Sequence, residues 1–384
     1  MPAAAPPPGP AATPARRGAA ALPRPGPGVE VVIPSIGRPS LLILLESLAR
    51  AGNPLPEAVI VVDDRPTRDG ALLPAPVPAP LEGRLRVVPS GPVGGRGPAA
   101  ARNAGWRSAR GGWVAFLDDD VVVPAGWSAA LIADLSGLGA DVAASQGKVQ
   151  VPLPDDRAPT DWERNVAGLS TARWATADMA YRRSLLEAVG GFDERFGRAY
   201  REDADLGLRT LAAGHRIEAG ARQVVHPVRP ADGWVSVRLQ AGNAEDPFMR
   251  ALHGRGWRQR AGVPGGRRPW HLATSAAAAT ALLAAARGRR RSALLAAAAW
   301  GGLTAELAWR RIAPGPRDAA ELARMAVTSA VLPLAATWHY LRGLAVLRRR
   351  LRAPGPRAVA GRHAVHANRH GHGVRLACEP LSPG

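Results

Sequence analysis

Short apolar runs alternate with helix-forming segments through the first half of the chain. The pattern predicts strands at residues 29–33, 58–62, 85–88, 113–117 and 142–144, and helices at 41–49, 98–110, 128–135 and 206–213. Alternation of this kind is typical of an α/β fold with a mostly parallel sheet and helices on both faces. Such sheets bind ligands beyond the carboxyl ends of their strands, so we expect the functional residues there.

The amino-acid composition changes three times along the sequence, which divides the chain into four regions. Residues 1–28 are rich in Pro and Ala, lack the apolar run of a secretory signal, and are predicted to be a disordered tail. Residues 29–249 carry the alternating pattern and form the predicted α/β domain. Residues 250–352 are predicted to be helical and rich in arginine, and 353–384 to be a second disordered tail.

The helical region contains three Ala-rich apolar segments, at 270–286, 292–305 and 325–341, separated by arginine clusters. None has the roughly 20 strongly apolar residues of a membrane-spanning helix. We interpret them as helices on or partly in a membrane surface, with arginines toward anionic head groups. This places the protein in the cytoplasm at the inner face of the cell membrane. The alternative is a soluble helical cap with a basic face.

Composition excludes several classes of protein. Among 384 residues, 46% are hydrophobic and 21% charged, which is typical of a globular chain. The single cysteine, Cys378, rules out an intramolecular disulfide scaffold. Residues 250–357 hold twenty arginines against three acidic residues, which is +17 of the net charge of +19. A basic nucleic-acid-binding protein remains an alternative, but the interleaved Ala and Leu runs favour lipid, so nucleic acid is not an expected partner.

Three consecutive carboxylates, Asp118-Asp119-Asp120, follow the apolar strand at 113–117. Burying them together is costly unless a cation compensates their charge, and oxygen ligands suit Mn²⁺ or Mg²⁺. Alternation along an extended segment predicts that Asp118 and Asp120 face the site while Asp119 faces away. The alternative is an exposed turn that caps a following helix.

Two further acidic groups lie at comparable places. Asp63-Asp64 close an earlier strand, and Glu202-Asp203 with Asp205 precede the helix at 206–213. The Gly-rich turn at 94–97 leads into a helix of small residues, where backbone amides can approach a phosphate or a sugar ring.

In these motifs the sequence resembles the family 2 glycosyltransferases, inverting enzymes with the GT-A fold. The resemblance covers residues 29 to about 228. It rests on six motifs in order: Val31-Val32-Ile33-Pro34 with Arg38, Val61-Val62-Asp63-Asp64, Ala101-Arg102-Asn103-Ala104-Gly105, Phe116-Leu117-Asp118-Asp119-Asp120, Gly190-Gly191-Phe192-Asp193-Glu194-Arg195-Phe196, and Glu202-Asp203-Ala204-Asp205-Leu206-Gly207-Leu208-Arg209.

The resemblance implies a role for each matching position. Asp118 and Asp120 would bind the metal, with His226 as a further ligand or, alternatively, a structural residue. Asp203 would be the catalytic base. The residues expected to bind the donor nucleotide are Pro34, Arg38, Asp64, Arg102, Asn103 and Asp119, and those expected on the acceptor side are Trp174, Asp178 and Glu202.

The resemblance therefore implies a metal-dependent inverting glycosyltransferase. Its donor would be a nucleotide-diphosphate sugar, a UDP-sugar foremost, and its acceptor a cell-envelope, lipid-linked or secondary-metabolite glycan. The family commonly has Gly-Ser after Asp64, where this chain has Arg65-Pro66. The identity of the nucleotide base is therefore not predicted. A nucleotidyltransferase with a related sheet is the alternative enzyme, but its usual Gly-rich loop with Arg and Lys is replaced here by Pro34-Ser35-Ile36-Gly37-Arg38.

Overall fold

The computed structural model describes Leu22, residues 28–73 and residues 76–357. Most of the two tails predicted at 1–28 and 353–384 lies outside these residues. Leu22 is buried against the apolar core.

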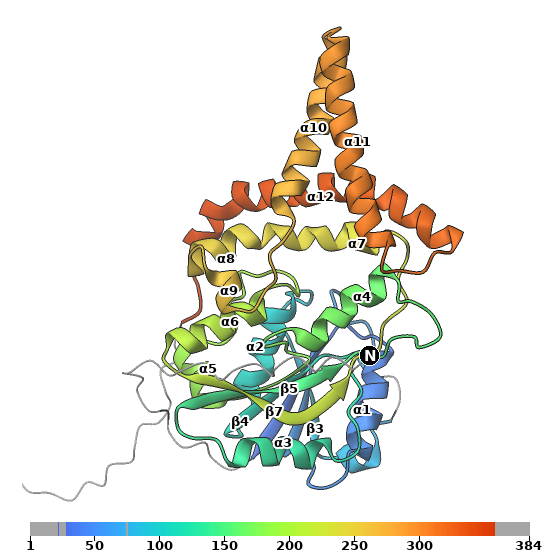
Figure 1. The fold of residues 1–384 in the computed structure, drawn as a ribbon. Coiled ribbons are helices and arrows are strands. Elements are labelled where there is room, and N and C mark those ends of the chain that lie inside the picture. The colour runs from blue at the N-terminus through green and yellow to red at the C-terminus, as the bar shows by residue number, and fades with distance from the viewer. Residues whose placement is uncertain (1–21, 23–27, 74–75, 358–384) are drawn as a thin grey trace, which may run out of the picture.

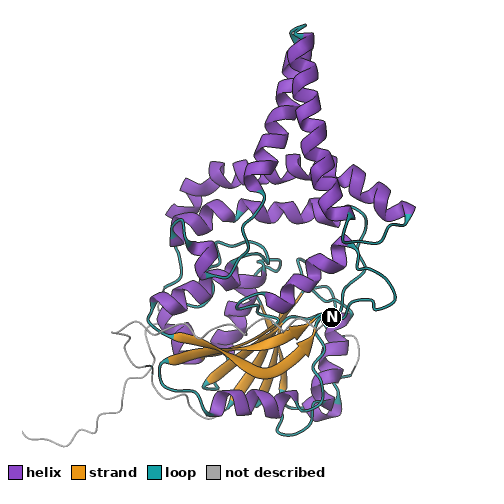
Figure 2. Ribbon diagram, viewed as in Figure 1, coloured by secondary structure: helices purple, strands orange, loops and turns teal. Residues whose placement is uncertain are grey.

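Seven strands form one sheet, which Figure 2 shows beneath the helices of the C-terminal part. They are β1 (Val29–Ser35), β2 (Ala58–Asp63), β3 (Leu85–Pro89), β4 (Trp113–Leu117), β5 (Val142–Gln150), β6 (Asp178–Arg182) and β7 (Arg216–Val225). Their order is β3-β2-β1-β4-β6-β5-β7. Strands β1 to β4 pair in parallel, β6 is antiparallel to β4 and β5, and β5 and β7 are parallel. The predicted α/β class with a mostly parallel sheet is confirmed.

The helices of the sheet domain are α1 (Ser40–Arg50), α2 (Pro98–Ser108), α3 (Trp127–Ser136), α4 (Asp161–Ala167), α5 (Arg183–Val189) and α6 (Glu202–Ala212). Short 3₁₀ turns add η1 (Ala79–Leu81), η2 (Gly168–Thr171) and η3 (Leu239–Ala244). The C-terminal part contains α7 (Val235–Arg238), α8 (Asp246–His253), α9 (Trp257–Arg260), α10 (Arg268–Ala286), α11 (Arg290–Ile312) and α12 (Ala319–Arg352).

Alternate side chains of the buried strands supply two apolar layers, one on each face of the sheet. On one face, Val32 and Phe116 belong to a cluster with Trp106 of α2. On the other face, Val31 and Val61 pack with the apolar side chains of α1 and α3. Because both faces are covered, the loops at the strand ends are left to form sites.

Helices α10 and α11 form a hairpin that projects from the body, and α12 lies across its base (Figure 1). Helix α12 also packs on α7, η3 and α8, which join the C-terminal part to the sheet domain. The predicted limit at residue 250 falls inside α8, so no break between elements marks it.

Among the described residues, α12 alone combines the length and apolar composition of a membrane-crossing helix, with a mean hydropathy of 1.3 over its most apolar window. In that window 39% is buried against the rest of the protein, and buried core helices can have the same composition.

Candidate functional site

A cavity of about 250 Å³ opens at the carboxyl ends of β1, β2 and β4. Most of the predicted donor and metal residues meet there, although they come from five separate segments of the chain. Its lining consists of Pro34, Ser35, Ile36, Arg38, Asp64, Pro98, Ala101, Arg102, Asp118, Asp119, Asp120, Ala199, His226 and Arg229. The acidic strand ends that the sequence singled out therefore line one cavity, and its role as a donor and metal site stays a prediction.

The three consecutive aspartates all line this cavity. The expectation that Asp119 faces away is wrong, because β4 ends at Leu117 and the aspartates lie in the turn that follows. Alternation of side chains applies only within the extended strand.

Each of these aspartates has its own arginine partner. Arg102 lies 2.8 Å from Asp118, Arg38 lies 2.8 Å from Asp119, and the Arg229 Nε lies 2.9 Å from the Asp120 Oδ2. Ser35 also donates a hydrogen bond of 2.7 Å to Asp119. The negative charge of the triplet is thus balanced within the protein.

Arg102 connects the cavity to the start of α6. Its side chain is buried and forms a second ion pair of 2.8 Å with Glu202. The other carboxylate oxygen of Glu202 is buried without a hydrogen-bond partner. Burial, and after it the charge of Asp203, raises the pKa of Glu202 to about 7. Burial also raises the pKa of Asp203.

The second acidic strand end holds the Gly-rich turn in place. The Asp64 carboxylate accepts hydrogen bonds of 2.8 and 2.9 Å from the backbone N–H groups of Arg96 and Gly97. Its neighbour Asp63 pairs with Arg65 at 2.8 Å, so the arginine that replaces the usual glycine folds onto its own strand end. Each Asp64 oxygen retains a lone pair for a ligand.

Residues 30–204 match the family described as Glycosyl transferase family 2. The family model thus describes this part of the chain, which we call the family 2 domain. The match contains the loop of residues 34–38, where nucleotide binding is predicted, together with the aspartate triplet and Asp203, and the fold is the predicted GT-A arrangement. No curated protein matches the chain significantly.

Several solved structures resemble the family 2 domain at low identity. TarS from S. aureus is 22% identical with a TM-score of 0.38, and the similarity covers 57% of this chain and 40% of TarS. The chain thus spans well under half the length of that protein. GalNAc-T7 with UDP, GalNAc and Mn²⁺ is 16% identical over 62% of this chain and 55% of that one, with a TM-score of 0.43.

The mannosyltransferase PcManGT from Pyrobaculum calidifontis, in complex with GDP-Man and Mn²⁺, is 18% identical. This similarity covers 88% of this chain and 90% of that one, with a TM-score of 0.42. TM-scores in this range are too low to assign function, so the assignment rests on the family match.

Five of the predicted site residues do not line the cavity of the family 2 domain: Asn103, Asp178, Trp174, Glu202 and Asp203. Asn103 is buried, where its amide bonds to the Phe192 backbone, Glu194 and Trp106. Asp178 is fully buried in β6 and accepts hydrogen bonds from Trp127 and Arg222. These amide and carboxylate groups hold the fold together, and a direct contact with donor or acceptor stays a prediction for both.

Trp174, the third of these residues, is buried beside α6. It has a positive φ of 63° and lies where a Cβ on Gly207 would meet its ring at 2.1 Å. A left-handed conformation is rare for a tryptophan, and its amide donates a 2.6 Å hydrogen bond to the Gln146 side chain. The predicted stacking of Trp174 on an acceptor sugar therefore stays a prediction too.

The sequence analysis did not identify Ser35 and Arg229 as site residues. Ser35 lies between two residues that it did select, Pro34 and Arg38, and its position at the end of a strand was the available signal. Arg229 follows His226 by three residues in a loop, and nothing in the sequence pairs it with Asp120.

The donor set of the family 2 cavity fits a divalent ion that is completed by a ligand. His226 Nε2 lies 3.4 Å from the Asp120 Oδ1, and Asp118 lines the same cavity. In the part of the chain that the structure describes, no three His, Cys, Asp or Glu side chains are arranged to hold an ion alone. Mg²⁺ and similar ions commonly take one or two carboxylates and complete their shell with substrate phosphates. Asp118 and Asp120 could supply those carboxylates, and His226 lies beside Asp120.

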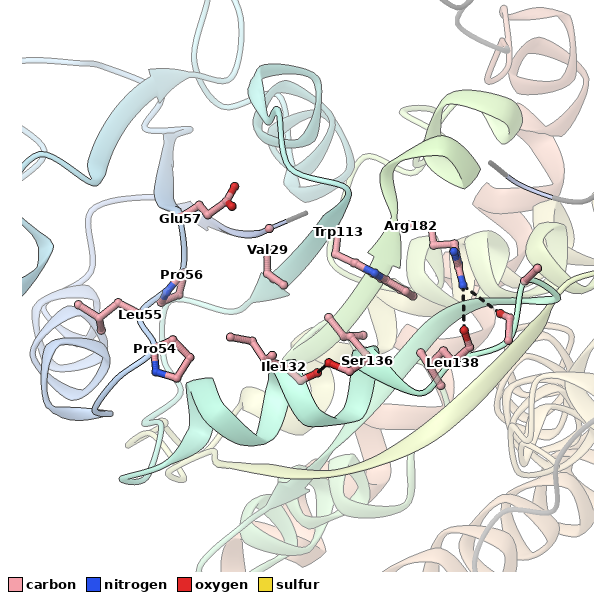
Figure 3. A pocket seen from close by; sticks show the side chains of 14 residues that line it. Val29, Pro54, Leu55, Pro56, Glu57, Trp113, Ile132, Ser136, Leu138 and Arg182 are labelled. Atoms are coloured by element: carbon pink, nitrogen blue, oxygen red, sulfur yellow. Dashed lines mark hydrogen bonds between the residues drawn. The ribbon is translucent and has the colours of Figure 1, made fainter. Parts of the chain in front are cut away.

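A second cavity, of about 720 Å³, lies at the opposite edge of the sheet (Figure 3). It is bordered by Val29 and Trp113, the first residues of β1 and β4, and by Arg182 at the end of β6. The Arg182 guanidinium donates to the backbone carbonyls of Val142, Leu138 and Gly139. The lining of this second cavity lacks the acidic triplet, so the smaller cavity is the candidate active site.

Proposed function

We propose that the protein is a metal-dependent inverting glycosyltransferase. It would transfer a sugar from a nucleotide-diphosphate sugar, a UDP-sugar foremost, to an acceptor hydroxyl. The observation that carries this proposal is the cavity itself: in a family 2 domain, Asp118, Asp120 and His226 share one cavity, and Arg102 joins it to the segment that holds Asp203.

The residues of the cavity can divide the work of transfer. Pro34, Ser35 and Arg38 border the place of the nucleotide, and Asp64 offers its free lone pairs to the base. A divalent ion held by Asp120, His226 and Asp118 would supply Lewis-acid stabilisation of the leaving diphosphate. Asp203 would accept the proton of the acceptor hydroxyl as that oxygen attacks the anomeric carbon. A single in-line displacement inverts the configuration at that carbon.

Arg102 has a positioning role in this proposal. It is buried and joins Asp118 to Glu202, so it fixes the spacing between the metal-binding turn and the start of α6. Because Glu202 precedes Asp203 directly, this ion-pair chain also sets the direction of the base.

The acceptor and the cellular location are further parts of the proposal. We place the protein in the cytoplasm at the inner face of the cell membrane, with a glycan or lipid-linked acceptor. The apolar α12 and the arginine-rich tip of the α10–α11 hairpin support this location.

Donor hydrolysis tests the proposed activity without knowledge of the acceptor. Purified protein with Mn²⁺ is incubated with UDP-, GDP- and dTDP-sugars, and release of nucleoside diphosphate is measured. We expect slow hydrolysis of at least one donor, which is lost when Mn²⁺ is chelated. Absence of both binding and hydrolysis across the panel would refute the proposed function.

A further inference from the structure

The three arginines that pair with the aspartate triplet differ in how firmly they are held. Arg102 is buried with 4% of its side chain exposed and pairs with two carboxylates. Arg38 is 38% exposed and belongs to the nucleotide loop after β1. Arg229 is the most exposed, at 45%, and pairs with Asp120 alone.

The carboxylate that Arg229 contacts is deeply buried. The side chain of Asp120 is 6% exposed, and burial, followed by the nearby charge of Asp118, raises its pKa. A buried carboxylate without a counter-charge is costly, whereas an exposed arginine loses little when it returns to water. Of the two partners, Arg229 is therefore the one that can leave, provided that another cation takes its place.

In the part of the chain that the structure describes, few hydrogen bonds hold the segment that carries Arg229. The residue lies in the segment between β7, which ends at Val225, and α7, which begins at Val235. The backbone of His226 is fixed by a 2.7 Å hydrogen bond from its backbone N–H to the Gln150 carbonyl. The Arg229 carbonyl accepts a 2.7 Å hydrogen bond from the Trp162 indole of α4. The segment is thus held at His226, at the Arg229 carbonyl, and near its end by the hydrogen bonds of Asp232 with Trp234 and Arg238.

The geometry points to a cation exchange at Asp120. The Arg229 guanidinium pairs with the Asp120 carboxylate, would leave it when a divalent ion binds, and would then contact the diphosphate of the nucleotide. This inference rests on the proposed metal-dependent function. It adds that Arg229 competes with the metal ion for Asp120 and, after the ion has bound, contacts the donor diphosphate. His226 stays beside Asp120 in both states because its backbone is fixed.

The exchange makes two predictions of opposite sign for one substitution. Arg229→Gln keeps much of the side-chain volume but removes the competing charge, so Mn²⁺ should bind roughly three- to tenfold more tightly. The same variant should bind UDP more weakly, by a similar factor, when Mn²⁺ is saturating. A residue with a merely structural role would shift both affinities in the same direction or neither.

The experiment measures Mn²⁺ binding by calorimetry or electron paramagnetic resonance, and UDP binding at saturating Mn²⁺, on the full chain. Arg238→Gln is the matched control, because Arg238 is 57% exposed, lies nine residues further along and pairs with Asp232 outside the cavity. It should leave both affinities unchanged. Hydrogen exchange of residues 228–234 gives a second readout, and Mn²⁺ alone should increase it in the wild type.

The outcomes separate the exchange from the proposed function. Unchanged or weaker Mn²⁺ binding by Arg229→Gln, in a protein whose wild type binds Mn²⁺ and UDP, overturns the exchange and leaves the proposed function standing. If the wild type binds neither Mn²⁺ nor UDP, both are overturned. Equal changes in the Arg238→Gln control would assign the effect to net charge and likewise overturn the exchange.

Discussion

At the scale of single residues, burial and neighbouring charge set the chemistry of the start of α6. Glu202 and Asp203 are adjacent carboxylates with raised pKa values, and Arg102 pairs with the first of them. If stability alone determined the residue at a buried position of this kind, an apolar side chain would be favoured over a charged one. The retained charges are therefore better explained by function.

Asp203→Asn should abolish most turnover. General base catalysis typically contributes about 10²- to 10⁴-fold, so kcat should fall within that range while nucleotide affinity stays within about twofold. Steady-state kinetics with the donor that the protein hydrolyses measures kcat, and calorimetry with UDP measures the nucleotide affinity. Asp232→Asn, at an exposed position, is the control. An equal loss of nucleotide affinity would contradict the role of Asp203 as base.

Stability should depend on pH through Glu202. In the folded protein its pKa is raised to about 7 from an ordinary value of 4.5, so the folded state binds more protons than the unfolded state between these values. The free energy of unfolding should then fall as pH rises through this range, by on the order of 3 kcal/mol from this group.

Urea unfolding at about pH 5 and about pH 7.5 measures this dependence. Glu202→Gln carries no titrating group and should lose that part of the decrease. A variant whose stability changes with pH as steeply as the wild type would show that Glu202 does not titrate in this range.

At the scale of elements, the sheet domain depends on close packing of α2 against β1 and β2. A Cβ added at Gly105 would lie 2.3 Å from Val32 Cγ1 and 3.0 Å from Val62 Cγ2, and both valines are fully buried. Gly105→Ala should therefore destabilise the protein by about 1 to 3 kcal/mol through overpacking.

Chemical denaturation measures the effect, and Gly301→Ala provides the matched control. Gly301 lies within α11, and a Cβ there would meet no atom within 4 Å. That substitution should be neutral or stabilise the protein by up to about 1 kcal/mol, since alanine favours helix. Similar destabilisation by both substitutions would count against the packing argument.

The elements that the sequence predicted well were those with strong apolar runs. Strands β1, β2 and β4 were recognised because they are short apolar runs whose residues are mostly buried. β3 has no buried residue but shows a short apolar run, and only the first three of the nine residues of β5 were predicted. Strands β6 and β7 were missed. β6 begins with Asp178 and ends with Arg182, and four of the ten residues of β7 are polar and interrupt its apolar positions, so neither has the apolar signature.

Site residues that directly follow a strand could be predicted from the sequence. Contacts between side chains far apart in the sequence could not. The acidic triplet and Asp64 were recognised from their positions in the sequence. Arg102 was assigned to the donor, yet its two ion pairs join residues 16 and 100 positions away. Partners at such separations depend on tertiary packing, which local patterns do not record.

At the scale of the whole molecule, positive charge and exposed leucine side chains gather at the tip of the α10–α11 hairpin. Leu282, Leu283, Leu294 and Leu295 are between 55% and 74% exposed. They flank the cluster Arg287, Arg289, Arg290 and Arg291. The hairpin stands away from the sheet domain in Figure 1, so these side chains are available to a surface.

The full chain should therefore bind vesicles that contain phosphatidylglycerol better than neutral phosphatidylcholine vesicles, and less so as salt increases. Replacing the four tip arginines by glutamine should weaken binding at least tenfold, since each contributes about 1 kcal/mol near an anionic surface. Co-sedimentation measures this, with Arg348→Gln/Arg349→Gln on α12 as the control off the hairpin. Equal binding to neutral vesicles would contradict the predicted contact with anionic lipid.

The central claim is that Asp118, Asp120 and His226 hold a divalent ion in the same cavity that receives the donor diphosphate. Crystals grown with Mn²⁺ and UDP, measured at the manganese absorption edge, test it most directly. We expect an anomalous peak in coordination contact with Asp120, with diphosphate oxygens completing the shell and Asp203 facing the open side of the cavity. A manganese peak elsewhere, or a nucleotide bound outside this cavity, would contradict the claim.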